Sequence, residues 1–251
     1  MICAMTGTAA RPGPASATPL VTYALIAVCC LTFLLGPASG FSTSHGTGVE
    51  LLAAQTAYFE QWGVVPRELW GGSPQELITP LTALFVHGNW LHLLGNMLFL
   101  YVFGAMAEER MGKLSFALFY LAAGVLALLA YAAAHAGSEQ TLVGASGAIS
   151  GVLGAFLRLF PRARVTSLFP FLFFLPLRFP AWAVLLFWFA LQWLAARTAG
   201  DRPGVAYLAH VVGFSLGFLY AWARYRRAVR VKNAAGPSEL RSPGGPPPDP
   251  R

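Results

Sequence analysis

The chain has 251 residues, of which 56% are hydrophobic and 11% charged, whereas a soluble globular domain has about 25% charged residues. This composition excludes an ordinary soluble enzyme and indicates a protein with several membrane spans. A net charge of +7 suggests nucleic-acid binding in a soluble protein, but in a membrane protein the basic residues report topology. We therefore expect no nucleic-acid partner.

Six apolar stretches approach the length of about 20 residues with which a helix crosses a bilayer. They lie at 20–36, 89–107, 114–134, 145–160, 180–196 and 204–223. They predict an all-α membrane protein, with a bundle of six transmembrane helices over 20–224. Residues 1–19 are expected to form a cytoplasmic tail. Residues 225–251, first basic and then rich in Pro and Gly, predict a disordered cytoplasmic tail.

The charges of the connections predict which side of the membrane each one faces. Basic residues flank the connection between the fourth and fifth stretches and follow the sixth: Arg158, Arg162, Arg164, Arg178, Arg224, Arg226, Arg227, Arg230 and Lys232. The connection 37–86 instead carries four glutamates and one arginine. Because cytoplasmic connections are enriched in Lys and Arg, we expect both termini in the cytoplasm and 37–86 outside. The location expected for this multi-pass protein is the plasma or inner membrane.

The second stretch contains the polar pair His92 and Asn96, in GNWLHLLGN. Four residues apart on a helix, the two side chains project from one face and can donate hydrogen bonds to a common acceptor. The spacing is equally consistent with hydrogen bonds to neighbouring helices, which polar groups in membrane bundles often make.

The fourth stretch opens with GASGAISGVLGA, in which Ser146 is followed by glycines at helical spacing. These glycines are Gly147, Gly151 and Gly154. A serine in this setting is more often part of a close-packing helix face than a nucleophile.

The sixth stretch supplies a possible base, because YLAHVVGFSLGF places His210 on one helix face with Gly213 and Gly217. Two faces of small residues allow helix backbones to approach closely. If the faces of the fourth and sixth stretches meet, the His210 imidazole comes within hydrogen-bond reach of the Ser146 hydroxyl. A serine nucleophile requires that contact.

Helix direction places these polar residues at similar depth. The second, fourth and sixth stretches all enter from the outer face. At about 1.5 Å per residue, His92, Asn96 and His210 lie within roughly 10 Å of that face, with Ser146 near the boundary. A water-filled cavity open to the outside is expected to serve all four. A transporter or channel, a rival function, predicts polar residues through the cytoplasmic halves as well, and those halves are almost wholly apolar.

Nothing in the sequence indicates a cofactor or a metal. Cys3, Cys29 and Cys30 have neither a disulfide framework nor metal-ligand spacing, and no H-E-x-x-H sequence of a zinc protease occurs. The only aspartates, Asp201 and Asp249, lie in a loop and in the tail. Two carboxylates within the membrane, as an intramembrane aspartyl protease needs, are therefore excluded.

Taken in order, these motifs resemble those of the rhomboid intramembrane proteases. HGNWLHLLGN is similar to the family's H-x-x-x-N motif with an upstream histidine, which is His87 here. GASG resembles the nucleophile motif at Ser146, and AHVVGFSLG resembles the A-H-x-x-G-x-x-x-G motif at His210. AEERMGK is similar to the family's E-x-R pair, at Glu108 and Arg110.

The resemblance, which covers about 19–224, implies a rhomboid-like bundle and an intramembrane serine endopeptidase that cleaves transmembrane segments of membrane proteins near the outer face. It implies a dyad of Ser146 and His210 without a third carboxylate. The oxyanion would be stabilised by the Ser146 N–H, His92 and Asn96. Structural support is expected from His87, Glu108, Arg110, Gly147, Gly213 and Gly217. The implied enzyme needs no cofactor or metal and works in the lipid bilayer, and its oligomeric state stays open.

One departure concerns the orientation of the base. Ser150 stands where some relatives carry an aromatic ring that packs under the catalytic histidine, so the orientation of His210 is expected to depend on other contacts. The alternative function is a catalytically inactive rhomboid-like scaffold that binds membrane proteins. The presence of both Ser146 and His210 argues against it.

Overall fold

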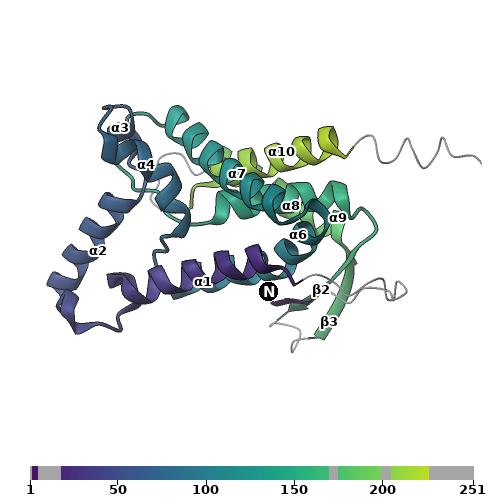
Figure 1. The fold of residues 1–251 in the computed structure, drawn as a ribbon, viewed down its shortest axis with the longest axis horizontal. Helices are drawn as coiled ribbons and strands as arrows, with labels where there is room; N and C mark the ends of the chain where they lie inside the picture. Colours follow the sequence, from purple (N-terminus) through teal and green to yellow (C-terminus); the bar gives the residue numbers. More distant parts are fainter. Residues whose placement is uncertain (1, 5–17, 170–174, 199–204, 226–251) are drawn as a thin grey trace, which may run out of the picture.

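Helices form at all six stretches that the sequence predicts to span a membrane (Figure 1). The computed structural model describes residues 2–4, 18–169, 175–198 and 205–225. The helices are α1 (Leu20–Leu35), the run Trp90–Met111, α7 (Lys113–Ala134), α8 (Ser146–Leu159), α9 (Ala181–Thr198) and α10 (Tyr207–Arg224). The expected tails, 1–19 and 225–251, lie mostly outside the described residues, and their disorder stays a prediction.

Among the residues that the structure describes, three helical segments are long and apolar enough to cross a membrane: Trp90–Met111, Lys113–Ala134 and Ala181–Thr198. Leu20–Leu35 and Ser146–Leu159 are shorter apolar helices. A helix thus occupies each predicted stretch, while the count of six crossings stays a prediction.

The run Trp90–Met111 consists of three parts. α5 (Trp90–Phe99) begins after Asn89, whose side-chain oxygen accepts a hydrogen bond from the backbone N–H of His92 at 2.9 Å. This is a common way of capping a helix N-terminus. A π-helical turn, η4 (Leu100–Gly104), then leads into α6 (Ala105–Met111). The cap determines where the helix begins and therefore where His92 lies.

The connection between α1 and α5, expected as an outer loop, contains further helices. They are η1 (Pro37–Ser39), η2 (Thr43–His45), α2 (Val49–Trp62), α3 (Pro66–Leu69), α4 (Pro74–Thr82) and η3 (Ala83–Phe85). The helices α2, α3 and α4 lie at the left-hand end of the molecule in Figure 1, opposite β2 and β3. This end corresponds to the predicted outer face.

A small antiparallel sheet departs from the all-α expectation. β2 (Arg164–Phe169) and β3 (Leu175–Pro180) pair in the connection between α8 and α9, and β1 (Ile2–Ala4) pairs with β2. Pro176 and Pro180 disfavour a helix in this connection, because proline lacks the backbone N–H that a helix interior needs. The described part of the chain is therefore mostly helical, with a three-stranded sheet at the end opposite α2.

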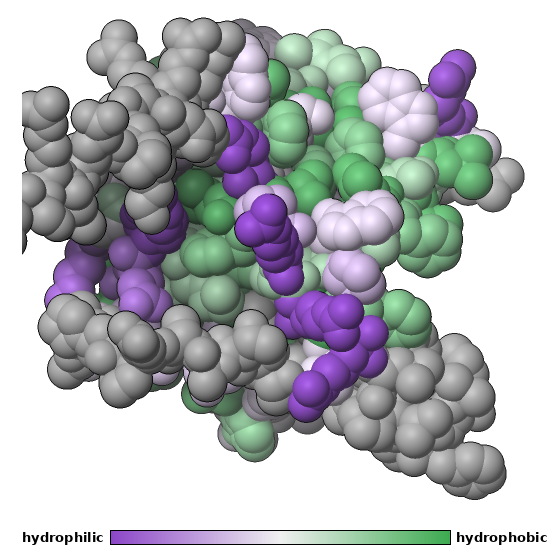
Figure 2. Space-filling view, turned by 90° about the vertical axis from the view of Figure 1, so that its right-hand side faces the viewer, coloured by the Kyte–Doolittle hydropathy of each residue, from purple (hydrophilic) through white to green (hydrophobic). Residues whose placement is uncertain are grey.

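Basic residues lie at the end of the molecule that carries the sheet. Arg164 and Arg178 are in β2 and β3, and Arg158 and Arg224 are in the last turns of α8 and α10. Figure 2 views this end and shows hydrophilic side chains gathered among hydrophobic ones. The positive charges predict that this end faces the cytoplasm.

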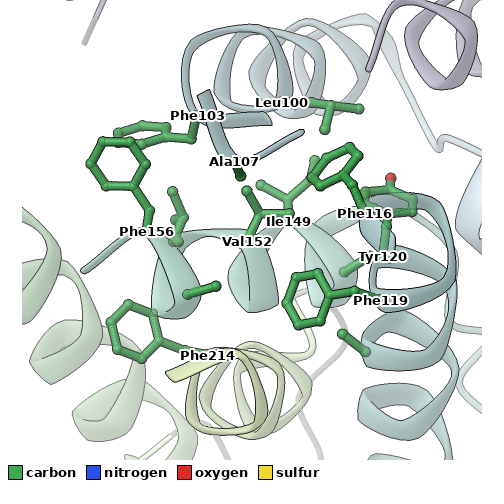
Figure 3. Packing of buried hydrophobic residues seen from close by; sticks show 14 of the residues in the cluster. Leu100, Phe103, Ala107, Phe116, Phe119, Tyr120, Ile149, Val152, Phe156 and Phe214 are labelled. Atoms are coloured by element: carbon green, nitrogen blue, oxygen red, sulfur yellow. The ribbon is translucent and has the colours of Figure 1, made fainter. Parts of the chain in front are cut away.

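α8 lies at the centre of the main hydrophobic core (Figure 3). Ten of its 14 residues are buried. Phe156 packs edge-on against Phe103 of η4 with ring centroids 5.0 Å apart, while Phe119 of α7 and Phe214 of α10 lie on other sides of α8. A helix enclosed on several sides has little freedom to shift. The core therefore positions Ser146, the first residue of α8.

Candidate active site

Ser146 begins α8 directly after a loop that turns sharply at Gly144. Gly144 has a φ of +119°, which residues with a side chain rarely adopt. A Cβ at this position would also meet the His92 ring at 2.6 Å. The Gly144 N–H donates to the Ala83 carbonyl at 2.8 Å, which ties the loop to η3. Because the first N–H groups of a helix have no partner within it, the Ser146 N–H points out of the start of α8.

His210 lies in the first turn of α10 with its side chain buried. Its Nε2 atom is 2.8 Å from the Oγ atom of Ser146. The hydrogen bond thus joins α10 to α8, through two residues that are 64 positions apart in the sequence. In this arrangement a serine hydroxyl can transfer its proton to an imidazole.

Glycines allow α8 and α10 to approach closely enough for this hydrogen bond. A Cβ at Gly213 would overlap the carbonyl group of Gly147, and one at Gly154 would overlap the carbonyl group of Phe214. The faces of small residues on the two helices are therefore in backbone contact, as the glycine spacing in the sequence suggests. This contact brings the starts of α8 and α10, and with them Ser146 and His210, together.

His92 and Asn96 line the same cavity as this pair. His92 Nδ1 accepts a hydrogen bond from the Gly88 N–H at 3.4 Å, which leaves the ring proton on Nε2. The Nδ2 atom of Asn96 is buried and has no hydrogen-bond partner among the described residues. Both side chains thus hold a donor available to a group bound near Ser146.

The cavity has a volume of about 700 Å³ and contains all four of these side chains. Its wall includes Thr141–Val143 before α8 and Val205–Tyr207 at the start of α10, together with Trp188 and Gln192 of α9. The loop segments lie at the end of the helices that is predicted to face outward. A peptide bond that enters from this end would meet the Ser146 hydroxyl.

Sequence reasoning missed the two α9 side chains, Trp188 and Gln192. Gln192 Oε1 lies 2.7 Å from Nδ1 of His210, and the Trp188 ring lies at 29° to the His210 ring with centroids 6.0 Å apart. Between Ala181 and Ala196, Gln192 is the only residue outside the apolar and aromatic set. A polar residue within a predicted span is a signal of function, so Gln192 was identifiable by that rule.

His87 lies behind His92, outside the membrane-spanning run, and is buried. Its Nδ1 atom is 3.3 Å from the Phe85 carbonyl oxygen, and its ring packs against that of His92 with centroids 5.2 Å apart. Burial, and secondarily the charge of His92, lower the pKa of His87 to about 4. A neutral His87 thus supports the residue that lines the cavity.

Glu108 and Arg110 lie away from the cavity, at the other end of the bundle. The buried Glu108 carboxyl group accepts hydrogen bonds from Val21 N at 3.0 Å, Thr22 N at 2.7 Å and Thr22 Oγ1 at 2.8 Å. It therefore caps the start of α1. The Arg110 guanidinium lies over the Tyr225 ring, 5.5 Å from its centroid, just beyond α10. Both residues hold helix ends together, and neither contacts Ser146.

Comparison with known proteins identifies the family. Residues 74–227 match the family model of the Rhomboid domain. This chain belongs to the rhomboid family. Members of the family are typically intramembrane serine proteases, although some members are inactive. Together with its long apolar helices, family membership makes this rhomboid chain an integral membrane protein.

Three rhomboid relatives illustrate the similarity. Rhomboid protein 1, mitochondrial, of Saccharomyces cerevisiae is 35% identical over 58% of this chain and 41% of its own length. Rhomboid protease GluP of Bacillus subtilis is 35% identical over 55% of this chain and 24% of its own length. Putative rhomboid protease YdcA of the same bacterium is 33% identical over 38% of this chain and 43% of its own length. The rhomboid chain thus spans less than half the length of each.

Proposed function

We propose that this rhomboid chain is an intramembrane serine endopeptidase that cleaves transmembrane segments of membrane proteins near the outer face. The observation that carries the proposal is the 2.8 Å hydrogen bond between Ser146 Oγ and His210 Nε2 inside a cavity large enough for a peptide segment. Family membership is consistent with it. We further propose that the protein lies in the plasma or inner membrane. In this topology both termini face the cytoplasm.

The first chemical step forms an acyl-enzyme. Ser146 Oγ attacks the carbonyl carbon of the scissile peptide bond while its proton moves to His210 Nε2. The carbonyl oxygen becomes an oxyanion, which the Ser146 N–H, His92 Nε2–H and Asn96 Nδ2–H stabilise. The imidazolium then gives its proton to the amide nitrogen, the carbon–nitrogen bond breaks and the amine product leaves.

The second step is hydrolysis. A water molecule from the cavity attacks the acyl carbon while His210 Nε2 takes one of its protons. The ester bond to Ser146 Oγ breaks, the proton on His210 returns to Oγ, and the product leaves as a carboxylic acid that gives its remaining proton to water. Because water must reach the acyl carbon, a cavity near the predicted outer boundary suits this step better than a site at the bilayer centre.

The test uses the purified protein in detergent with a model single-pass transmembrane substrate. Wild type is compared with Ser146→Ala and His210→Ala, and with Ser215→Ala as a matched serine control on α10. The Ser215 hydroxyl donates to the Val211 carbonyl of its own helix. Wild type and Ser215→Ala should cleave, and the two dyad variants should not. Cleavage by Ser146→Ala at the wild-type rate would overturn the mechanism.

A labelled fluorophosphonate separates the protease from the alternative, an inactive scaffold. The probe reacts with a serine only when a neighbouring base activates it. An active enzyme should be labelled in the wild type and in Ser215→Ala but not in Ser146→Ala. A wild-type protein that is folded, unlabelled and unable to cut any transmembrane substrate would instead support the scaffold.

A further inference from the structure

Both nitrogens of the His210 ring are engaged, and the second partner lies on a different helix from Ser146. Nδ1 is 2.7 Å from Oε1 of Gln192 on α9, while Nε2 is 2.8 Å from Ser146 Oγ on α8. The imidazole is thus held between two helices that flank α10.

We propose that Gln192 is a positioning residue for the dyad, which sets the tautomer and the orientation of His210. The inference rests on the proposed protease function, because it assigns Gln192 a part in the chemistry of the same site. Gln192 itself does not touch the reacting atoms, and acts through the His210 ring.

The tautomer follows from the hydrogen-bonding groups. An amide oxygen can only accept a hydrogen bond, so the proton of the neutral His210 ring lies on Nδ1. Nε2 then carries the lone pair that faces the Ser146 hydroxyl, as a general base requires. In triads of serine proteases a carboxylate selects this tautomer from the same side of the ring. Here a neutral amide takes that place.

The second contact that orients His210 comes from α9, because the nearby Ser150 of α8 is engaged elsewhere. The Ser150 hydroxyl, one turn after Ser146, donates to the Ser146 carbonyl at 2.6 Å and is committed there. Trp188 and Gln192 are four residues apart on α9 and therefore share a face. Trp188 lies beside the plane of the His210 ring and Gln192 binds its edge. Together they restrict rotation of the imidazole.

The position of Gln192 explains why an apolar helix carries a polar residue here. Its neighbours Leu191 and Trp193 are exposed on the apolar surface of α9, whereas Gln192 is half-buried and lines the cavity. Of the residues of α9, which the structure describes in full, only Ala181 and Leu185 are buried. An amide within a membrane is costly unless its polar atoms are paired. The hydrogen bond to His210 pairs the oxygen of that amide.

Gln192→Leu removes the acceptor at nearly constant volume, and Gln192→Glu keeps an acceptor oxygen at the same reach. Leu191→Ala is the control for a general effect on α9. With a model transmembrane substrate in detergent, Gln192→Leu should lower kcat by about 10- to 100-fold, part of the usual contribution of a general base, with KM nearly unchanged. Gln192→Glu should retain most of the wild-type kcat, and Leu191→Ala all of it. An equal loss of kcat in Gln192→Leu and Gln192→Glu would overturn the inference. It would indicate that Gln192 acts through packing and not through its acceptor oxygen.

A spectroscopic measurement tests the tautomer without requiring turnover. In protein labelled with ¹⁵N at histidine, the His210 signals are assigned by their absence from His210→Ala. At a pH where the ring is neutral, wild type should show a protonated Nδ1 and an unprotonated Nε2, and Gln192→Leu should show a mixture of tautomers. The same spectrum in both proteins would overturn the positioning role.

The two proposals fail in different ways. Cleavage that persists in Ser146→Ala removes the protease mechanism while the ¹⁵N spectra still report on Gln192. Cleavage that depends on Ser146 but is unchanged in Gln192→Leu removes only the role of Gln192.

Discussion

Gly217 of α10 lies against the backbone of Gly151 of α8 so closely that a Cβ at Gly217 would overlap the Gly151 carbonyl group. Gly217→Ala is therefore expected to push the two helices apart. The free energy of unfolding should fall by about 1–3 kcal/mol, the usual effect of overpacking. Thermal unfolding of the purified protein in detergent measures the change.

The matched control for Gly217→Ala is Gly95→Ala on α5, where an added Cβ meets no atom within 4 Å outside its own helix turn in the described part of the chain. Because Ala favours a helix over Gly, this variant should unfold at or above the wild-type temperature. An equal loss of stability in both variants would show that the contact between α8 and α10 does not set the effect.

Asn96→Ala is expected to lower kcat by about 10- to 1,000-fold, because it removes a donor to the oxyanion while other donors remain. The melting temperature should hardly change, since the Nδ2 atom of Asn96 has no partner among the described residues. Steady-state cleavage of a model transmembrane substrate measures kcat. Asn96→Asp, which has the same shape but offers acceptors in place of donors, should be at least as impaired. Wild-type kcat in both variants would remove Asn96 from the mechanism.

Glu108→Ala is expected to destabilise the fold without acting on the chemistry. The substitution leaves the Val21 and Thr22 N–H groups at the start of α1 without their acceptor. An unsatisfied buried donor costs about 1–3 kcal/mol, so the melting temperature should fall clearly. Glu109→Ala, at the exposed neighbouring position, is the control and should unfold like wild type. If Glu108→Ala and Glu109→Ala have the same melting temperature, the hydrogen bonds of Glu108 to α1 do not stabilise the fold.

Stability should fall as the pH is lowered between about 6.5 and 4. The folded protein keeps His87 neutral down to a pKa of about 4, chiefly through burial, whereas an unfolded chain takes up the proton near pH 6.5. In this window the unfolded state binds more protons, so the free energy of unfolding decreases with falling pH, by up to about 1.4 kcal/mol per pH unit for one group.

Unfolding measured at pH 7 and pH 4.5 in wild type and His87→Gln tests this pH dependence. The variant is expected to lose less stability on acidification than wild type does. An identical loss in the two proteins would assign the pH dependence to other groups.

Several features of the fold follow from local sequence alone. Runs of apolar residues long enough to cross a bilayer predict where α1, α7 and α9 lie, because the length of an apolar helix is set by the membrane thickness. The β2–β3 pair was not expected, since strand pairing depends on contacts between segments that a hydropathy pattern does not report. The helices of the outer connection were missed for a related reason. Their apolar runs are shorter than a span.

The candidate site was likewise predicted only in part from the sequence. Glycine spacing around Ser146 and His210 suggests two helix faces that can pack closely, but the same glycines are typical of packing without chemistry. The contact of these faces and the 2.8 Å hydrogen bond exist only in the folded bundle. The sequence does not reveal the partner of Gln192, because His210 is 18 residues away and lies on another helix.

The sequence by itself determined that this protein is a membrane protein. It also predicted that one end of the helices carries four polar residues: Ser146, His92, Asn96 and His210. Hydropathy and helical periodicity are properties of short segments, so they can be derived from the amino-acid sequence alone. Only the tertiary structure decided that α9 brings Gln192 to the far side of the His210 ring. Side-chain partners on different helices are selected by how the helices pack, and that selection is a property of the whole bundle.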